Sequence, residues 1–168
     1  MNTLDAIKSR RSIRKYDPET GVPREHITQM LEAAMMAPSA CNTRPWEFVV
    51  VESREVKEKI MRVMPYTQML ATAPTAIVIC GRPDLQENIC EGFWPQDCGA
   101  AAQNILLAAK DLGYGTCWCG CYPLAQRVED MQKVLAVSSI PLAVIAVGKA
   151  DETPDARGFL DETRVTYI

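Results

Sequence analysis

The segment that decides the fold of this chain reads DCGAAAQNILLAA and occupies residues 97–109. It forms the centre of a helix that we expect over residues 96–112. Apolar side chains recur along this helix at helical spacing and give it one wide apolar face: Cys98, Ala101, Ala102, Ile105, Ala109 and Leu112. Gly113 follows as the C-terminal stop. The many small alanines allow a second helix to approach closely, within the chain or across a dimer.

Strands and helices alternate on both sides of this helix. Beta-prone runs predict four strands, at residues 46–51, 76–80, 116–121 and 142–147. Helical spacing of apolar residues predicts three further helices, over residues 27–35, 53–64 and 124–135. Asn2 can cap a short N-terminal helix, and the chain from residue 149 onward is polar and extended. The alternation alone predicts a parallel doubly wound sheet, but the G-x-G-x-x-G turn and the P-loop are both missing, which disfavours those two nucleotide-binding folds.

The composition fits one globular domain spanning residues 1–168. Apolar residues make up 48% of the chain, which is enough for a sizeable core. The formal charge of −3 gives no electrostatic reason to expect nucleic acid or an anionic membrane surface as a partner. No apolar run approaches the roughly 20 residues of a membrane-spanning helix, and the N-terminus lacks the apolar core of a signal peptide. We therefore expect a cytoplasmic protein.

The seven cysteines are interpreted as thiols. Their number is odd and no export signal precedes them, so disulfides are not expected, and most of them should act as small core residues. Cys117, Cys119 and Cys121 alternate along a predicted strand and therefore share one face. Structural zinc usually takes C-x₂₋₄-C pairs plus a second ligand pair, and iron–sulfur clusters need four well-spaced ligands. No metal site is expected, although a metal-binding module built on these three cysteines stays open as an alternative.

A cationic segment, RRSIRK at residues 10–15, is the first candidate for ligand binding. Four of its six residues are cationic and a serine sits among them. The planar fork of arginine suits phosphate, and a serine hydroxyl can add a neutral hydrogen bond. The alternative for this segment alone is a solvated basic face at a helix end.

Two other segments could approach a ligand through their backbones. PSACNTRPW at residues 38–46 is a loop bracketed by prolines, whose exposed N–H and C=O groups could read the polar edge of a flat heterocycle. GYGTCWCGC at residues 113–121 carries glycines around a strand, which permit close backbone approach to a ligand. The alternative for each segment alone is a plain connection between elements. His26, the only histidine, has no evident acidic or thiol partner and is expected on the surface.

Taken together, these segments resemble the nitroreductase family. RRSIRKY at residues 10–16 resembles its opening motif, and residues 38–46 resemble its P-S-x-x-N-x-Q-P-W loop with Arg44 replacing the usual glutamine. Residues 97–109 are similar to its long central helix, and LGYGTCWCG at residues 112–120 to the loop that follows. ETRV at residues 162–165 matches its short basic C-terminal motif. Five matches in the family's order are far more specific than any one of them.

The resemblance implies an α+β fold with a central, mostly antiparallel sheet flanked by helices, and an intertwined homodimer with FMN between the subunits. Arg10 and Ser12, with Arg164 from the tail, would hold the phosphate, and Arg11 would assist. Arg14 would approach the N1–O2 pole of the flavin, where a cation stabilises the reduced ring. The other subunit would contact the ring and the ribityl chain with Pro38, Ser39, Ala40 and Asn42. Three residues would lie against the isoalloxazine, with a backbone N–H directed towards N5: Trp118, Cys119 and Gly120.

The activity that the resemblance implies is electron transfer from NADH or NADPH, through FMN, to a small organic acceptor such as a nitroaromatic or a quinone, by a ping-pong mechanism. No side chain is expected to be catalytic, because the flavin carries the chemistry. Cys119 stands where a glutamate is common, which changes the polarity near N5. The chain is also short for the family, which suggests an open acceptor site. A flavin-binding or flavin-storage protein without physiological turnover is the main alternative.

Overall fold

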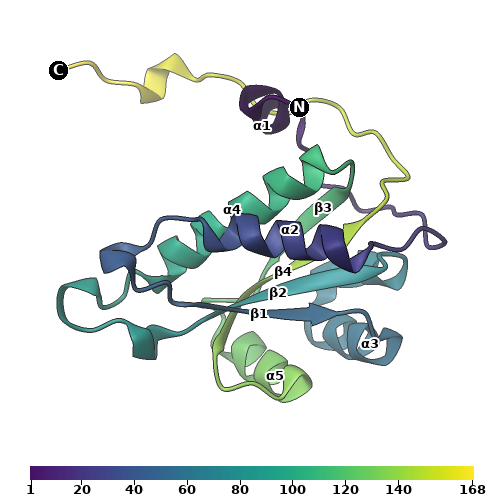
Figure 1. Ribbon diagram of the computed structural model, residues 1–168, viewed down its shortest axis with the longest axis horizontal. Coiled ribbons are helices and arrows are strands. Elements are labelled where there is room, and N and C mark those ends of the chain that lie inside the picture. Colours follow the sequence, from purple (N-terminus) through teal and green to yellow (C-terminus); the bar gives the residue numbers. More distant parts are fainter.

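The computed structural model describes all 168 residues and is built on one antiparallel sheet (Figure 1). The strands run in the order β1-β2-β4-β3. Their bounds are Trp46–Val51 for β1, Thr75–Gly81 for β2, Gly115–Gly120 for β3 and Ile140–Gly148 for β4. All three neighbouring pairs are antiparallel. The antiparallel sheet implied by the resemblance is therefore confirmed.

The parallel sheet suggested by the alternation of elements is wrong, and the burial of β2 explains why. All seven residues of this strand are buried, because helices cover both faces of the sheet. A strand covered on both faces has a continuous apolar sequence, as the strands of a parallel sheet do. The sequence of β2 therefore does not indicate whether its neighbouring strands are parallel or antiparallel to it.

Helices form one layer on each face of the sheet (Figure 1). α2 (Arg24–Met35) and α4 (Trp94–Asp111) lie on one face, and α3 (Arg54–Val63) and α5 (Ala125–Leu135) lie on the other. The core is accordingly divided in two by the sheet. The first half includes the fully buried Met30, Ile105 and Ile145. The second half includes Ile60, Met131 and Val144. Val144 and Ile145 are neighbours in β4, and their side chains pack in opposite halves of the core.

The helix boundaries agree closely with the apolar spacing. The helix expected over residues 96–112 is α4, and Asn2 caps α1 (Thr3–Ser9) by accepting from the backbone N–H of Asp5. Ser53 caps α3 in the same way, through the N–H of Val56. None of the helices is both long and apolar enough to span a bilayer.

The segment after α1 is fixed against the free edge of β3. The Ile13 N–H donates to the Thr116 carbonyl over 2.8 Å, and Ser12 forms a parallel bridge with Thr116. Gly115 makes this approach possible, because a Cβ there would lie 2.7 Å from Cγ1 of Ile13. The Glu152 carboxylate accepts from the backbone N–H groups of Arg14 and Lys15. The cationic segment is therefore held beside the first residues of β3.

The tail after β4 runs past α1 and away from the sheet (Figure 1). It contains only one short 3-10 helix, Glu162–Arg164. Its apolar side chains have no cover within the chain: Phe159 is 87% exposed and Tyr167 is 94% exposed. This agrees with the extended tail predicted from residue 149 onward.

The cysteines give one correction. Cys41 and Cys90 form a disulfide, although no disulfide was expected from the sequence. They are 49 residues apart in the chain, and only the fold brings their two loops together. The other five are buried free thiols, which confirms their interpretation as small core residues: Cys80, Cys98, Cys117, Cys119 and Cys121.

Candidate active site

A groove of about 850 Å³ opens beside the end of β3. Its walls come from three parts of the chain: the N-terminal segment, the 3-10 helix η2 (Pro65–Ala71) and β3 itself. Arg14 lies on the first wall, and Trp118, Cys119 and Gly120 lie on the third. Four of the residues selected from the sequence therefore meet in one cavity.

A second, polar recess adjoins the groove, because Arg14 lines both. Arg10, Arg11 and Ser12 also line this recess, whose volume is about 350 Å³ and whose lining also includes Glu152, Pro154 and Asp155. Arg157 adds a further cation from the tail. The segment interpreted as a phosphate-binding motif therefore presents its cations to a common space next to the groove.

Arg164 is not brought to this recess within the chain. It lies on the exposed tail, where its guanidinium pairs with Asp161 at 2.9 Å. Its side chain is 84% exposed.

Three residues of β3 form one wall of the groove, and each presents something different to it: Trp118, Cys119 and Gly120. Trp118 is 38% exposed and points to the α4 face, where its ring lies 3.9 Å from the position of a Cβ on Gly99. Cys119 points to the opposite face and is buried. Gly120 is exposed, and a Cβ built on it would meet nothing within 4 Å. The open space at Gly120 lets a flat ligand approach the strand backbone closely.

Cys117 and Cys119 lie together on the inner side of this wall, in the buried half of the core on the α3 and α5 face. The neighbouring Cys119 thiol lowers the pKa of Cys117 to about 7, helped by the positive charge of Arg14 and opposed by burial. The neighbouring Cys117 in turn raises the pKa of Cys119, and burial adds to the rise. The Cys119 sulfur also lies 3.3 Å from the Tyr66 carbonyl oxygen. The first proton of the pair is therefore lost at a lower pH than from an ordinary cysteine.

The alternative of a metal-binding module has no support from this geometry. The structure contains no group of three or more His, Cys, Asp or Glu side chains arranged to hold a metal ion. Cys121 lies in the same buried core cluster as Cys117 and Cys119, and burial raises the pKa of Cys121.

The loop at residues 38–45 lies at the far end of α2 from the cationic segment (Figure 1). The 12 residues of α2 alone span about 18 Å. Pro38, Ser39, Ala40 and Asn42 therefore do not line the groove of their own chain. One chain holds two parts of the predicted site at opposite ends.

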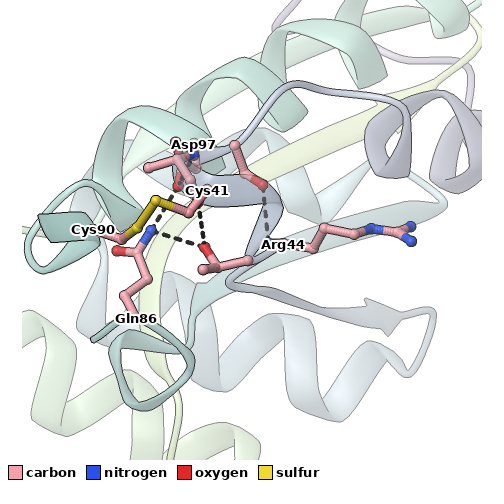
Figure 2. Close-up of a disulfide and its surroundings, with 8 residues drawn as sticks. Cys41, Arg44, Gln86, Cys90 and Asp97 are labelled. Atoms are coloured by element: carbon pink, nitrogen blue, oxygen red, sulfur yellow. Dashed lines mark hydrogen bonds between the residues drawn. A yellow bond between two sulfur atoms is a disulfide. The ribbon is translucent and has the colours of Figure 1, made fainter. Parts of the chain in front are cut away.

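This loop is bent tightly and cross-linked (Figure 2). Cys41, Asn42 and Arg44 have φ angles of 51°, 55° and 50°. Each left-handed conformation of a non-glycine residue costs about 1–2 kcal/mol. The Ser39 hydroxyl accepts from the Arg44 N–H over 2.9 Å, and the disulfide joins Cys41 to Cys90. Such unfavourable conformations persist where surrounding contacts hold them and are common at functional sites.

Comparison with known proteins identifies this architecture. The chain matches the model of the Nitroreductase family over residues 7–64 and 62–149. The protein is a member of the nitroreductase family. A relative from Methanothermobacter thermautotrophicus is 47% identical over 167 residues, which cover 98% of this chain and 86% of the relative. That relative carries the provisional name NADH dehydrogenase/NAD(P)H nitroreductase.

Solved structures of other nitroreductase-like proteins superpose closely. A protein of the same provisional name from Parabacteroides distasonis has a TM-score of 0.92 and 35% identity, with 99% of this chain and 98% of that chain covered. A provisionally named nitroreductase from Desulfovibrio desulfuricans, solved in complex with FMN, has a TM-score of 0.84 and 28% identity over 100% of this chain and 98% of that chain.

Two features of this nitroreductase-family chain escaped the sequence analysis. Tyr66, Gln68 and Met69 of η2 line the groove, but their segment has neither helical nor strand periodicity. Pro65 at its start was the one available signal for a short helical turn. His26 is half-buried, and its Nδ1 lies 2.8 Å from the Tyr114 hydroxyl, a partner that no local motif indicates.

Proposed function

We propose that this protein is an FMN-dependent oxidoreductase that moves electrons from NADH or NADPH to a small organic acceptor. The observation that carries the proposal is that a recess lined by four arginines and two acidic residues adjoins a groove, one wall of which contains residues 118–120. FMN has a matching form, with an anionic phosphate at one end and a flat ring at the other. The solved relative from Desulfovibrio desulfuricans, which contains FMN, supports the same cofactor.

The residues of one chain fit the two ends of FMN. Arg10, Arg11 and Ser12 would hold the phosphate, because guanidinium groups bind phosphate through paired hydrogen bonds. Arg14 lines both cavities and would place its charge near the N1–O2 pole of the ring. The exposed backbone around Gly120 would meet the ring near N5.

A homodimer would complete the site. The Pro38, Ser39, Ala40 and Asn42 loop lies too far from the groove of its own chain, so a two-fold partner would supply it. Arg164 would reach the phosphate of the other subunit in the same way, since its tail projects from the body with its apolar side chains exposed. Residues 1–168 act in this proposal as one cofactor-binding domain.

Bound FMN supplies the redox chemistry by accepting a hydride equivalent from the nicotinamide and passing the electrons on. The protein binds and orients the reactants, and no side chain serves as a catalytic acid or base. Donor and acceptor would use the same open groove in turn, which gives ping-pong kinetics. Nitroaromatics and quinones are the acceptor class proposed.

The test begins with the purified protein. We expect a yellow preparation with about one FMN per chain, a dimer by light scattering, and NAD(P)H oxidation that depends on an added quinone. A colourless protein that takes up no added FMN would overturn the proposal. An FMN-containing protein with no acceptor-dependent rate would instead favour the storage function.

The phosphate recess has its own test. Arg10→Ala should weaken FMN binding by about 1.5–3 kcal/mol, the usual loss for a hydrogen bond to a charged group. Arg24→Ala is the matched control, because Arg24 is exposed at the start of α2 and lines neither cavity. Equal losses in both variants would indicate a general field effect and contradict a specific phosphate site.

A further inference from the structure

The carboxylate of Asp97 is buried beneath the loop at residues 38–45 (Figure 2). Asp97 lies in the first turn of α4 and is only 7% exposed. Both of its carboxylate oxygens lie 3.2 Å from the backbone nitrogen of Ala40, which donates its N–H to them. A buried carboxylate is costly unless hydrogen-bond donors surround it. The position of the loop and the position of this carboxylate therefore depend on each other.

Gln86 is the second donor to Asp97. Its Nε2 donates to Oδ2 of Asp97 over 2.8 Å and also lies 3.2 Å from the Thr43 hydroxyl. Gln86 is 5% exposed, and its Oε1 has no hydrogen-bond partner. The amide nitrogen thus links the carboxylate to the far side of the same loop. No ion pair includes Asp97, and its hydrogen-bond donors are Ala40 of the loop and Gln86 beside it.

The loop requires such support because of its backbone. Three of the four residues from Cys41 to Arg44 have left-handed φ angles, and none of them is glycine. An unsupported loop would relax towards ordinary conformations. The Asp97 bond holds Ala40, directly before the first left-handed residue, and the disulfide from Cys41 to Cys90 holds that residue itself.

We propose that Asp97 is a positioning residue for the cofactor: it holds residues 38–42 in the conformation that contacts FMN bound by the opposing subunit. This inference rests on the proposed function. Asp97 acts through Ala40 and does not itself contact the flavin. The disulfide is the parallel, covalent restraint on the same loop, so either restraint limits the damage when the other is lost.

The expected effect follows from the population of the binding-competent loop. The apparent dissociation constant rises in inverse proportion to the fraction of loops that are correctly placed. Asp97→Asn removes the charge and one of the two acceptor oxygens, and the new NH₂ group faces the N–H donor of Ala40 or that of Gln86. We expect FMN affinity to fall on the order of tenfold. The fall should be larger in a Cys90→Ser background, where the covalent restraint is missing.

The experiment is an FMN titration of the full-length protein by flavin fluorescence, together with visible circular dichroism of the flavin at saturation. Asp130→Asn is the matched control, because it makes the same chemical change on α5, which lies on the other face of the sheet. Asp97→Asn should alter both the affinity and the flavin dichroism. Asp130→Asn should leave both at the wild-type values. A purely structural role of Asp97 would lower thermal stability without changing the dichroism of bound flavin.

The outcomes separate this inference from the proposed function. If the wild-type protein binds no FMN, the proposed function fails and this inference fails with it. If the wild type binds FMN and Asp97→Asn binds it equally well with unchanged dichroism, only the positioning role is overturned. Should Asp97→Asn fail to fold, Gln86→Leu decides the matter. That variant removes one donor to Asp97 and leaves Ala40 in place, so it should weaken FMN binding several-fold, and wild-type affinity in Gln86→Leu would overturn the role.

Discussion

Opening the Cys41–Cys90 disulfide should destabilise the protein by an amount that the chain separation sets. The two cysteines lie 49 residues apart, and closing a loop of that length restricts the unfolded chain by about 4 kcal/mol at 25 °C. For a chain of this size, each 1 kcal/mol corresponds to about 2–4 °C in the unfolding midpoint. The full effect is therefore about 8–16 °C.

The assay has two stages. Thiol titration of protein purified without reductant and then denatured should detect the five free cysteines, and reduction should raise the number to the full seven. Thermal unfolding is then followed by circular dichroism, with and without reductant, at one protein concentration. The double variant Cys41→Ala and Cys90→Ala should unfold at the lower midpoint of the reduced wild type. Reductant should not change the midpoint of this variant.

Two results would refute the reasoning. Seven reactive thiols in the unreduced protein would show that the cross-link does not form. An unchanged midpoint on reduction, with the five-to-seven change in thiols confirmed, would show that the two loops separate before the cooperative unfolding of the sheet. In that case the cross-link would restrict the unfolded chain and the state just before the transition to the same extent, so the midpoint would not change.

Two further predictions concern the groove wall and the core. Alkylation of Cys117 by iodoacetamide, measured by mass spectrometry on the apoprotein, should accelerate as pH rises through about 7, because the thiolate is the reactive form. Cys119→Ala should move this rise to higher pH by removing the neighbouring thiol that lowers the pKa of Cys117, and an unchanged profile would contradict that cause. Gly81→Ala should destabilise the fold by about 1–3 kcal/mol in denaturant unfolding, because its Cβ would lie 2.0 Å from the Trp94 ring. Gly21→Ala, whose Cβ meets nothing within 4 Å, should change stability by less than about 0.5 kcal/mol, and equal effects would contradict the steric argument.

The sequence determined the elements and their caps. The run at residues 46–51 is β1, Asn2 caps α1 as expected, and the helix expected from residue 53 begins directly after Ser53. These features depend on neighbours within a few residues, so the local pattern contains the information. The alternation of Cys117 and Cys119 likewise placed both on one face of β3, because successive side chains of a strand point to opposite sides.

The motifs also determined the candidate site as a set of segments. Arg10, Arg11, Ser12 and Arg14 do share one polar recess, and Arg14 extends to the groove. Local chemistry was sufficient here because the four residues are close in sequence. The lining from η2 was missed, since Tyr66 and Met69 reach the groove only through the packing of that turn against β3.

Only the tertiary structure decided the relations between distant segments. The strand order β1-β2-β4-β3 and its antiparallel pairing depend on which edges meet, and β2 is buried on both faces whichever way its neighbours run. The Cys41–Cys90 bond and the contact of Asp97 with Ala40 join residues 49 and 57 positions apart. Short-range periodicity in the sequence reports the burial of each element, whereas pairing across such separations is fixed by the packing of the whole chain.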